Sequence, residues 1–143
     1  MKRKLAFLTV LLATLVVSTV FVACDKDDDP VELTLKTLVA GDIDMNGATS
    51  PSNIPANPTI VATFSTAVDA ATAVAANIKL TQDYDDANIA LTITVSGSTV
   101  TIVPQSELGG GALYLLEFTA GLKSTEGKFL TALSRSFTTV GTF

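Results

Sequence analysis

Residues 32–143 are predicted to form one antiparallel β-sandwich of about seven strands, an all-β fold. Two observations lead to this prediction. Apolar and polar residues alternate with a period of two over several short runs, as in strands that are buried on one face. Turn-forming residues separate these runs at intervals of roughly ten residues, which is typical of the strands of a sandwich.

The first half of the domain contains two strand patterns and one different stretch. Residues 31–38 alternate valine and leucine with polar residues, and residues 58–64 form the next apolar run. Between them, residues 41–58 hold three prolines and many turn formers. Residues 65–77 are rich in alanine, and Asp69 is placed as an N-cap, so we expect one or two helical turns there.

The second half of the domain is a series of strand patterns. These runs span residues 78–81, 89–95, 99–103, 112–118 and 133–139. The pair at 89–95 and 99–103 is joined by Ser96, Gly97 and Ser98, and both runs are rich in β-branched residues. Alternating runs joined by a short glycine turn are the strongest hairpin signal in the chain.

The chain begins with the features of an export signal. Residues 1–4 are basic, and residues 5–22 are almost wholly apolar. Ala23-Cys24 resembles the bacterial lipobox, in which a small residue precedes the lipidated cysteine, although Phe21 stands where leucine is usual. We therefore expect residues 1–23 to be a lipoprotein signal peptide that is removed. An apolar run of this length also fits a plain N-terminal membrane anchor, which is the alternative.

Cys24 is the only cysteine in the sequence. A single thiol excludes an internal disulfide, and an unpaired thiol in an exported protein calls for an explanation that lipidation supplies. One acyl chain such as palmitate holds a protein only marginally, at about 0.8 kcal/mol per buried methylene, whereas two or three hold it durably. The resemblance therefore implies permanent attachment to the membrane through Cys24.

An acidic tether follows the cysteine, and we assign residues 24–31 to it. Its charged residues are Asp25, Lys26, Asp27, Asp28 and Asp29. Such a run is typical of a solvated linker. It also resembles the export signal of surface lipoproteins of gut-commensal-type Gram-negative bacteria, which implies a lipid anchor in the outer membrane and display at the cell surface. A periplasm-facing lipoprotein is the alternative location.

Composition excludes several classes of function. Without residues 1–23 the chain keeps six basic and fourteen acidic residues, a net charge of −8, so no nucleic-acid partner is expected. Histidine is absent, which excludes Ser-His-acid and Cys-His catalysis and leaves no zinc ligand set. Composition alone does not exclude a catalytic pair of carboxylates for glycoside hydrolysis. However, the acidic residues fall mostly in turns, and no tryptophan is available to stack on a sugar. We expect no enzyme and no catalytic residue.

Several short motifs occur in the order expected for a known domain. They include Asn46-Gly47-Ala48-Thr49, Asn57-Pro58-Thr59-Ile60, Thr63-Phe64-Ser65, Tyr114-Leu-Leu-Glu-Phe118 and Ser136-Phe137-Thr138-Thr139. Together they resemble the bacterial immunoglobulin-like (Ig-like) domain of S-layer (SbsA) type over residues 35–139. Ser124-Thr-Glu-Gly-Lys128 replaces the Asp-x-x-Gly-Asn run of that family. The resemblance implies an Ig-like sandwich in an extracellular spacer or adhesion context, and no reaction.

One stretch offers calcium ligands. Asp42, Asp44 and Asn46 precede Gly47 with the spacing that opens an EF-hand loop, in which alternate side-chain oxygens converge on the ion. The twelfth position is Asn53 and not a glutamate, and the flanks are not helical. Closely spaced carboxylates in the turn at residues 83–86 offer oxygens too, but such turns are usually only solvated. No other cofactor is expected.

Three functions follow from these observations. The first is a lipid-anchored surface protein that binds a protein or a glycan, mediates adhesion or serves a surface complex. The second is a structural spacer or assembly subunit of the envelope or of a pilus-like structure. The third and least supported is a small hydrolase. The sequence does not decide the identity of the ligand or the oligomeric state. It also does not decide whether the chain is a truncated member of a family of longer proteins.

Overall fold

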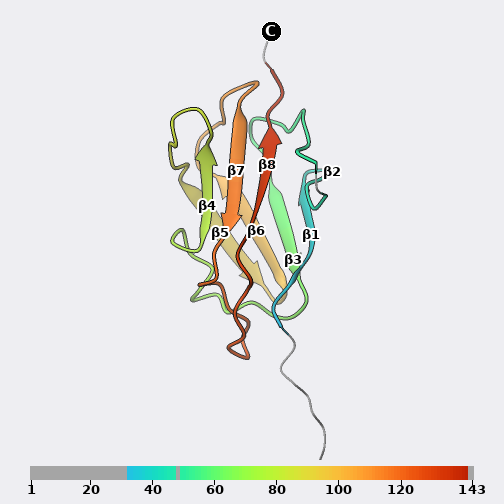
Figure 1. The fold of residues 1–143 in the computed structure, drawn as a ribbon, viewed down its shortest axis with the longest axis vertical. Coiled ribbons are helices and arrows are strands. Elements are labelled where there is room, and N and C mark those ends of the chain that lie inside the picture. Colours follow the sequence, from blue (N-terminus) through green and yellow to red (C-terminus); the bar gives the residue numbers. More distant parts are fainter. Residues whose placement is uncertain (1–31, 48, 142–143) are drawn as a thin grey trace, which may run out of the picture.

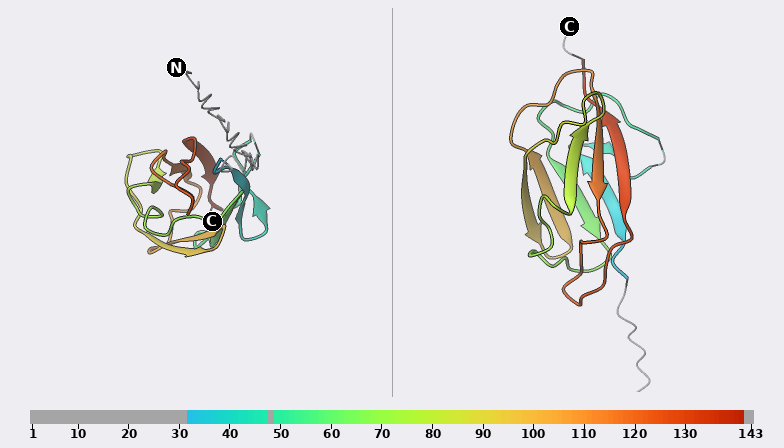
Figure 2. Two further views of the ribbon diagram at one scale, coloured as in Figure 1. Left: turned by 90° about the horizontal axis from the view of Figure 1, so that it is seen from below. Right: turned by 60° about the vertical axis from the view of Figure 1, so that its left-hand side comes forward.

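The computed structural model describes residues 32–47 and 49–141, and these residues form eight strands in two antiparallel sheets (Figure 1). The strands are β1 (Leu35–Ala40), β2 (Ile43–Asp44), β3 (Ile60–Phe64), β4 (Ile78–Gln82), β5 (Leu91–Ser96), β6 (Thr99–Pro104), β7 (Leu113–Phe118) and β8 (Leu133–Thr138). The larger sheet has the order β2-β1-β3-β6-β5, and the smaller has the order β4-β7-β8. The two sheets lie face to face as a sandwich (Figure 2).

The strands run along the long axis of the body, so the connections gather at its two ends (Figure 1). The entry pole is the end where the described chain begins, and it holds residues 32–34, 65–77, 97–98 and 119–132. The loop pole is the opposite end, with residues 41–47, which include the short strand β2, and residues 49–59, 83–90 and 105–112. The described chain also ends at the loop pole. The long loops are therefore separated from the start of the domain by the full length of the strands.

The core lies between the sheets because each inner strand buries every second side chain. In β3, Ile60, Ala62 and Phe64 are buried while the residues between them are half-buried, and β7 follows the same rule. The ring of Phe64 meets that of Phe118 edge to face, with centroids 5.8 Å apart, and thereby joins the two sheets. This alternation confirms the predicted sandwich. Tyr114 and Phe118 are both core residues.

The hairpin predicted at residues 96–98 is confirmed. Ser96 pairs with Thr99, so Gly97 and Ser98 form a two-residue loop. Gly97 has φ = +58°, whereas Ser98 has no positive φ, and this combination matches a type II′ turn with glycine first. This turn fixes the register of β5 against β6.

The structure corrects the prediction of helical turns in residues 65–77. The described chain contains no helix, and this segment forms separate hydrogen-bonded turns. Asp69 does act as a local cap, because its Oδ1 accepts the N–H of Ala71 at 3.0 Å. Backbone bonds to other segments hold the segment in this form, because Val68 and Asp69 donate their N–H groups to the carbonyls of Gly97 and Lys123. Accordingly, no helix of the described residues is long and apolar enough to span a membrane.

Candidate functional site

The predicted anchor and export residues lie outside the described part of the chain. They are Cys24, Asp25, Lys26, Asp27, Asp28 and Asp29. The structure begins eight residues after Cys24, at Glu32. Lipidation of Cys24 and the sorting role of the acidic tether therefore remain predictions.

The calcium candidates lie at the loop pole in and around β2, where Asp42 and Asp44 are exposed. Asp44 Oδ1 accepts the backbone N–H of Asn46 at 2.7 Å. The side-chain Nδ2 of Asn46 donates to the carbonyl of Lys36 at 2.8 Å. Among the described residues there is no cluster of three or more carboxylate, histidine or cysteine side chains suited to a metal ion. Calcium at this loop remains a prediction from the EF-hand-like spacing.

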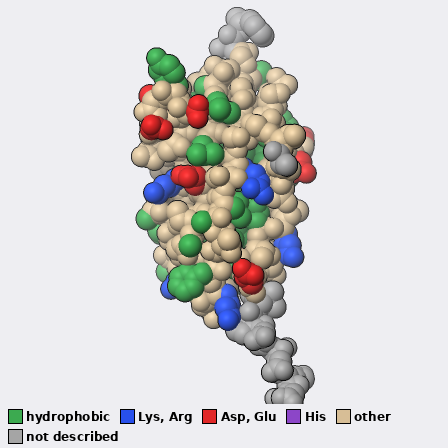
Figure 3. Space-filling model, viewed as in Figure 1, with side chains coloured by type: hydrophobic (Ala, Val, Ile, Leu, Met, Phe, Trp, Pro, Cys, Tyr) green, Lys and Arg blue, Asp and Glu red, His purple; other side chains and the backbone are tan. Residues whose placement is uncertain are grey.

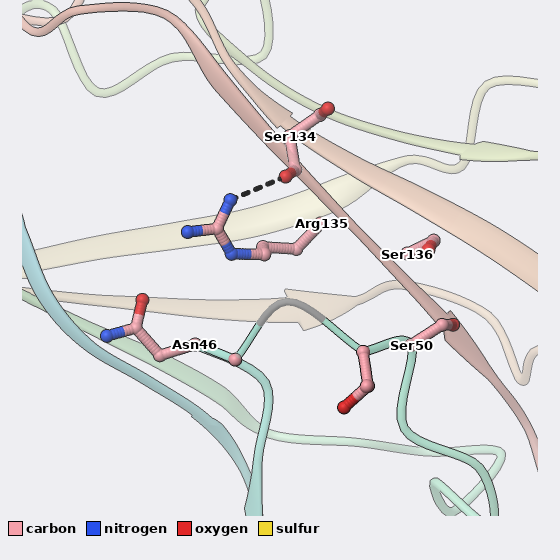
Figure 4. A pocket seen from close by; sticks show the side chains of 7 residues that line it. Asn46, Ser50, Ser134, Arg135 and Ser136 are labelled. Atoms are coloured by element: carbon pink, nitrogen blue, oxygen red, sulfur yellow. Dashed lines mark hydrogen bonds between the residues drawn. The ribbon is translucent and has the colours of Figure 1, made fainter.

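A polar cavity of about 410 Å³ lies between β8 and the loop that follows β2 (Figure 4). It is lined by Asn46, Gly47, Thr49, Ser50, Ser134, Arg135 and Ser136. Hydroxyl and amide groups dominate this lining, and Arg135 is its only charged member. The cavity forms because the loop at residues 50–54 pairs with the end of β8 and then leaves the strand. Thr138 donates to the carbonyl of Pro51 and accepts from Ile54, but no such bonds cover Ser134 and Ser136.

Arg135 points into the space between the sheets, because it shares a face of β8 with Leu133 and the buried Phe137. One terminal nitrogen of the guanidinium donates to the carbonyl of Ser134 at 2.8 Å. Its Nε is buried and has no hydrogen-bond partner among the described residues. A guanidinium with a free donor in a polar cavity is suited to a carboxylate or another planar anion.

Three of the four sheet edges are protected against pairing with another strand. The edge at β2 has only two residues, and the neighbouring carbonyls of β1 at Lys36 and Leu38 are taken by Asn46 and Met45. The edge at β8 carries the inward charge of Arg135 and is partly covered by residues 50–54. The edge at β4 carries Lys79 and is bonded through Leu80 and Gln82 to residues 87–89. Short strands, charges and covering loops are the usual devices that protect sheet edges.

The fourth edge, β5, has none of these protections. It is six residues long and uncharged, with the sequence Leu-Thr-Ile-Thr-Val-Ser. Gln105 donates its N–H to the carbonyl of Ala90, so even-numbered residues of this strand bond to β6 and odd-numbered residues turn their N–H and C=O outward. Of the outward groups, the carbonyl of Leu91 accepts from Gln105 Nε2. The N–H and C=O of Ile93 and Val95 have no partner in the described part of the chain.

An apolar groove of about 400 Å³ lies between β4 and the segment that leads into β5. It is lined by Ala75, Ile78, Lys79, Leu80, Asn88, Ile89 and Ala90. The smaller sheet has three strands against five in the larger one, so it does not fully cover β5. As a result Leu91, Ile93 and Val95 face the interior and are only half-buried.

Charge is distributed unevenly between the two ends of the body. The loop pole holds six acidic residues and, among the described residues, neither lysine nor arginine. Those six are Asp42, Asp44, Asp83, Asp85, Asp86 and Glu107. All four described lysines lie in the half that contains the entry pole, together with four acidic residues. Figure 3 shows red side chains near the upper end of one face, and both blue and red ones in its middle and lower part.

Sequence analysis did not single out Arg135 or β5. A signal for Arg135 is present, because the run Leu133-Ser-Arg-Ser-Phe137 places a charge at an apolar position of the alternation. No local signal distinguishes β5 from a strand inside a sheet, because the order of strands depends on contacts between distant parts of the chain.

Comparison with known proteins identifies the kind of domain. The family model described as "Bacterial Ig-like domain" matches residues 43–139. No curated protein matches the chain.

Solved structures of the bacterial S-layer protein SbsC are similar in fold. The N-terminal part of SbsC matches with 24% identity and a TM-score of 0.56, covering 77% of this chain and 24% of that one. The structure of SbsC domains 1–6 matches with 23% identity and the same TM-score, over 78% of this chain and 14% of that one. The present chain thus spans a small part of those longer proteins.

Proposed function

Because the chain belongs to the bacterial Ig-like domain family, a non-enzymatic kind of domain, we propose that it is a lipid-anchored surface protein. In this proposal Cys24 carries the acyl chains in the outer membrane, the acidic tether directs export, and the single sandwich binds a protein or glycan or mediates adhesion. The chain itself carries out no catalysis.

The observation that supports this proposal is the position of the two poles. The described chain starts at the entry pole, and the eight residue steps from Cys24 to Glu32 span at most about 29 Å when fully extended. An acylated Cys24 therefore holds the entry pole towards the membrane and the loop pole away from it. Tyr84, at the loop pole, is 92% exposed, which is the placement expected of a contact residue.

The cavity around Arg135 is the site we assign to a small acidic ligand group. A carboxylate on a glycan or on a protein side chain would pair with the guanidinium of Arg135, and the surrounding hydroxyls would bond the neighbouring groups of the ligand. Because the body is acidic as a whole, this isolated cation would select for a group that fits the cavity and not for anionic polymers in general.

A second candidate function is that of a structural spacer or assembly subunit. The open edge of β5 favours it, because pairing of edge strands is a known way in which β-sheet domains join side by side.

Acyl labelling and protease access in intact cells test the first proposal. The wild-type chain is expected to incorporate labelled fatty acid and to be removed from intact cells by external protease. Cys24→Ala is expected to abolish both. Absence of label in the wild type would overturn the anchor, whereas labelled protein that resists external protease would overturn only surface display.

A further inference from the structure

We propose that two copies of this domain pair through β5, antiparallel and centred on Ile93, and that this pairing joins copies anchored on two facing cells. The proposal deepens the adhesive function given above and rests on it for the direction of the anchor. The pairing itself follows from the exposed edge.

The outward backbone groups of β5 are complementary to themselves. In an antiparallel pair, only residues with outward N–H and C=O groups can stand opposite one another as hydrogen-bonded partners. Centring the pair on Ile93 places Ile93 opposite its own copy and Leu91 opposite Val95. All three residues have outward groups, and the carbonyl of Leu91, which accepts from Gln105 Nε2, would use its second lone pair. The two β5 strands would therefore join the two larger sheets into one continuous sheet.

The same register brings the half-buried apolar side chains of β5 together. Leu91, Ile93 and Val95 lie on the inner face of their strand, pack against the core and are partly exposed in a single copy. In the pair, the corresponding side chains of the second copy lie beside them and remove this surface from water. No charged residue occurs on the strand, so nothing on it repels an identical strand.

Charge distribution favours the antiparallel arrangement of the bodies. Antiparallel strands reverse the long axis, so the loop pole of each copy lies beside the entry half of the other. This places the six acidic residues of one copy near the half of its partner in which four lysines balance four acidic residues, and not near six further acidic residues. A parallel arrangement would place the two acidic poles together. In the antiparallel arrangement the anchors leave from opposite ends of the pair. The paired copies therefore fit two facing membranes and not one.

Cysteine pairs across the proposed register test the model directly. Thr92 and Thr94 are exposed, stand opposite each other in this register, and form a close pair without backbone hydrogen bonds, which suits a disulfide. One strain displays Thr92→Cys with one epitope tag, and a second strain displays Thr94→Cys with another tag. After mixing and mild oxidation, we expect dimers carrying both tags. When both strains display Thr92→Cys, we expect a several-fold lower yield of dimers carrying both tags. Wild-type chains should form no such dimers.

A charge exchange provides a second test that does not depend on disulfide chemistry. Cells that display the double variant Thr92→Lys, Thr94→Lys should not aggregate with one another, because lysines then face lysines in the pair. Mixing them with cells that display Thr92→Glu, Thr94→Glu should restore aggregation. Both positions are exposed, so the fold of the monomer is retained, and thermal unfolding of each variant checks this.

Each outcome decides a separate part of the proposal. The proposed register is overturned if acylated protein, both on cells and in detergent, forms cross-links equally with all cysteine combinations. It is also overturned if no combination forms cross-links. Cross-linking that occurs only when both variants share one cell overturns pairing between facing cells. If no acyl label is incorporated, the anchor of the proposed function fails, and the detergent experiment still decides whether β5 pairs with its copy.

Discussion

Thr139 shows how a single buried hydroxyl joins the end of the chain to the loop before β7. The residue is 2% exposed, its Oγ1 accepts the N–H of Ala112 at 3.0 Å, and it donates to the carbonyl of Gly109. The phenolic oxygen of the buried Tyr114 accepts the N–H of Gly109 at 2.7 Å. Two buried side chains therefore hold this glycine loop at the loop pole.

Replacing Thr139 by valine keeps the shape of the side chain and removes these hydrogen bonds. The free energy of unfolding is expected to fall by about 1–3 kcal/mol, since the partly buried N–H of Ala112 is left without its acceptor. Urea denaturation measures the loss. Thr59→Val, at an exposed position, is the control and should change stability by less than about 0.5 kcal/mol. Equal effects at both positions would contradict this role of Thr139.

Arg135 is expected to lower the free energy of unfolding, because its role is to bind a ligand and not to stabilise the fold. Arg135→Met keeps a long stem and removes the buried Nε–H that has no partner, so unfolding should cost about 1 kcal/mol more in the variant. The same change should abolish any binding of carboxylate sugars such as glucuronate, followed by titration calorimetry with glucose as the neutral control. A clear loss of stability would show that Arg135 is part of the structural network and would count against a ligand role.

At the scale of elements, two glycines are required for different physical reasons. At Gly97 the backbone has φ = +58° and an added Cβ meets nothing within 4 Å, so only backbone strain opposes a side chain. At Gly121 an added Cβ overlaps the side chain of Asn77. That side chain accepts from Thr119 Oγ1 and donates to the carbonyl of Thr72, so it links the segment before β4 to the loop after β7.

These differences predict that replacement by alanine lowers the free energy of unfolding by different amounts at the two glycines. Gly97→Ala should cost about 1 kcal/mol, and Gly97→Asn less, because asparagine tolerates positive φ. Gly121→Ala should cost about 2 kcal/mol or more, because Asn77 must move and lose its hydrogen bonds. Thermal unfolding of the three variants gives the order. A larger loss for Gly97→Ala than for Gly121→Ala would contradict the packing described at Asn77.

Local patterns predicted the strands because alternation and turn chemistry act over a few residues. The runs that became β3 to β8 and the turn at Gly97 were identified in this way. The two-residue strand β2 was missed, since it exists only through its pairing with Val39 and Ala40. The cavity around Arg135 could not be predicted either. It depends on residues 50–54 folding back onto β8, which is a contact between segments more than eighty residues apart.

For the whole molecule, the separation of the poles relates the fold to its proposed use. The strands place the start of the described chain at one end and the acidic loops at the other, while β5 runs along the side (Figure 1). One small domain thereby offers an attachment end, a display end and a lateral edge. This division of the surface is the one that the proposed lipid-anchored surface protein requires.

Attachment through Cys24 is the claim on which the orientation depends, and the intact mass of the chain purified from membranes tests it most directly. We predict the mass of residues 24–143 increased by a glyceryl group with two or three acyl chains. A chain that retains residues 1–23, or one that begins at Cys24 with no added mass, would contradict the account.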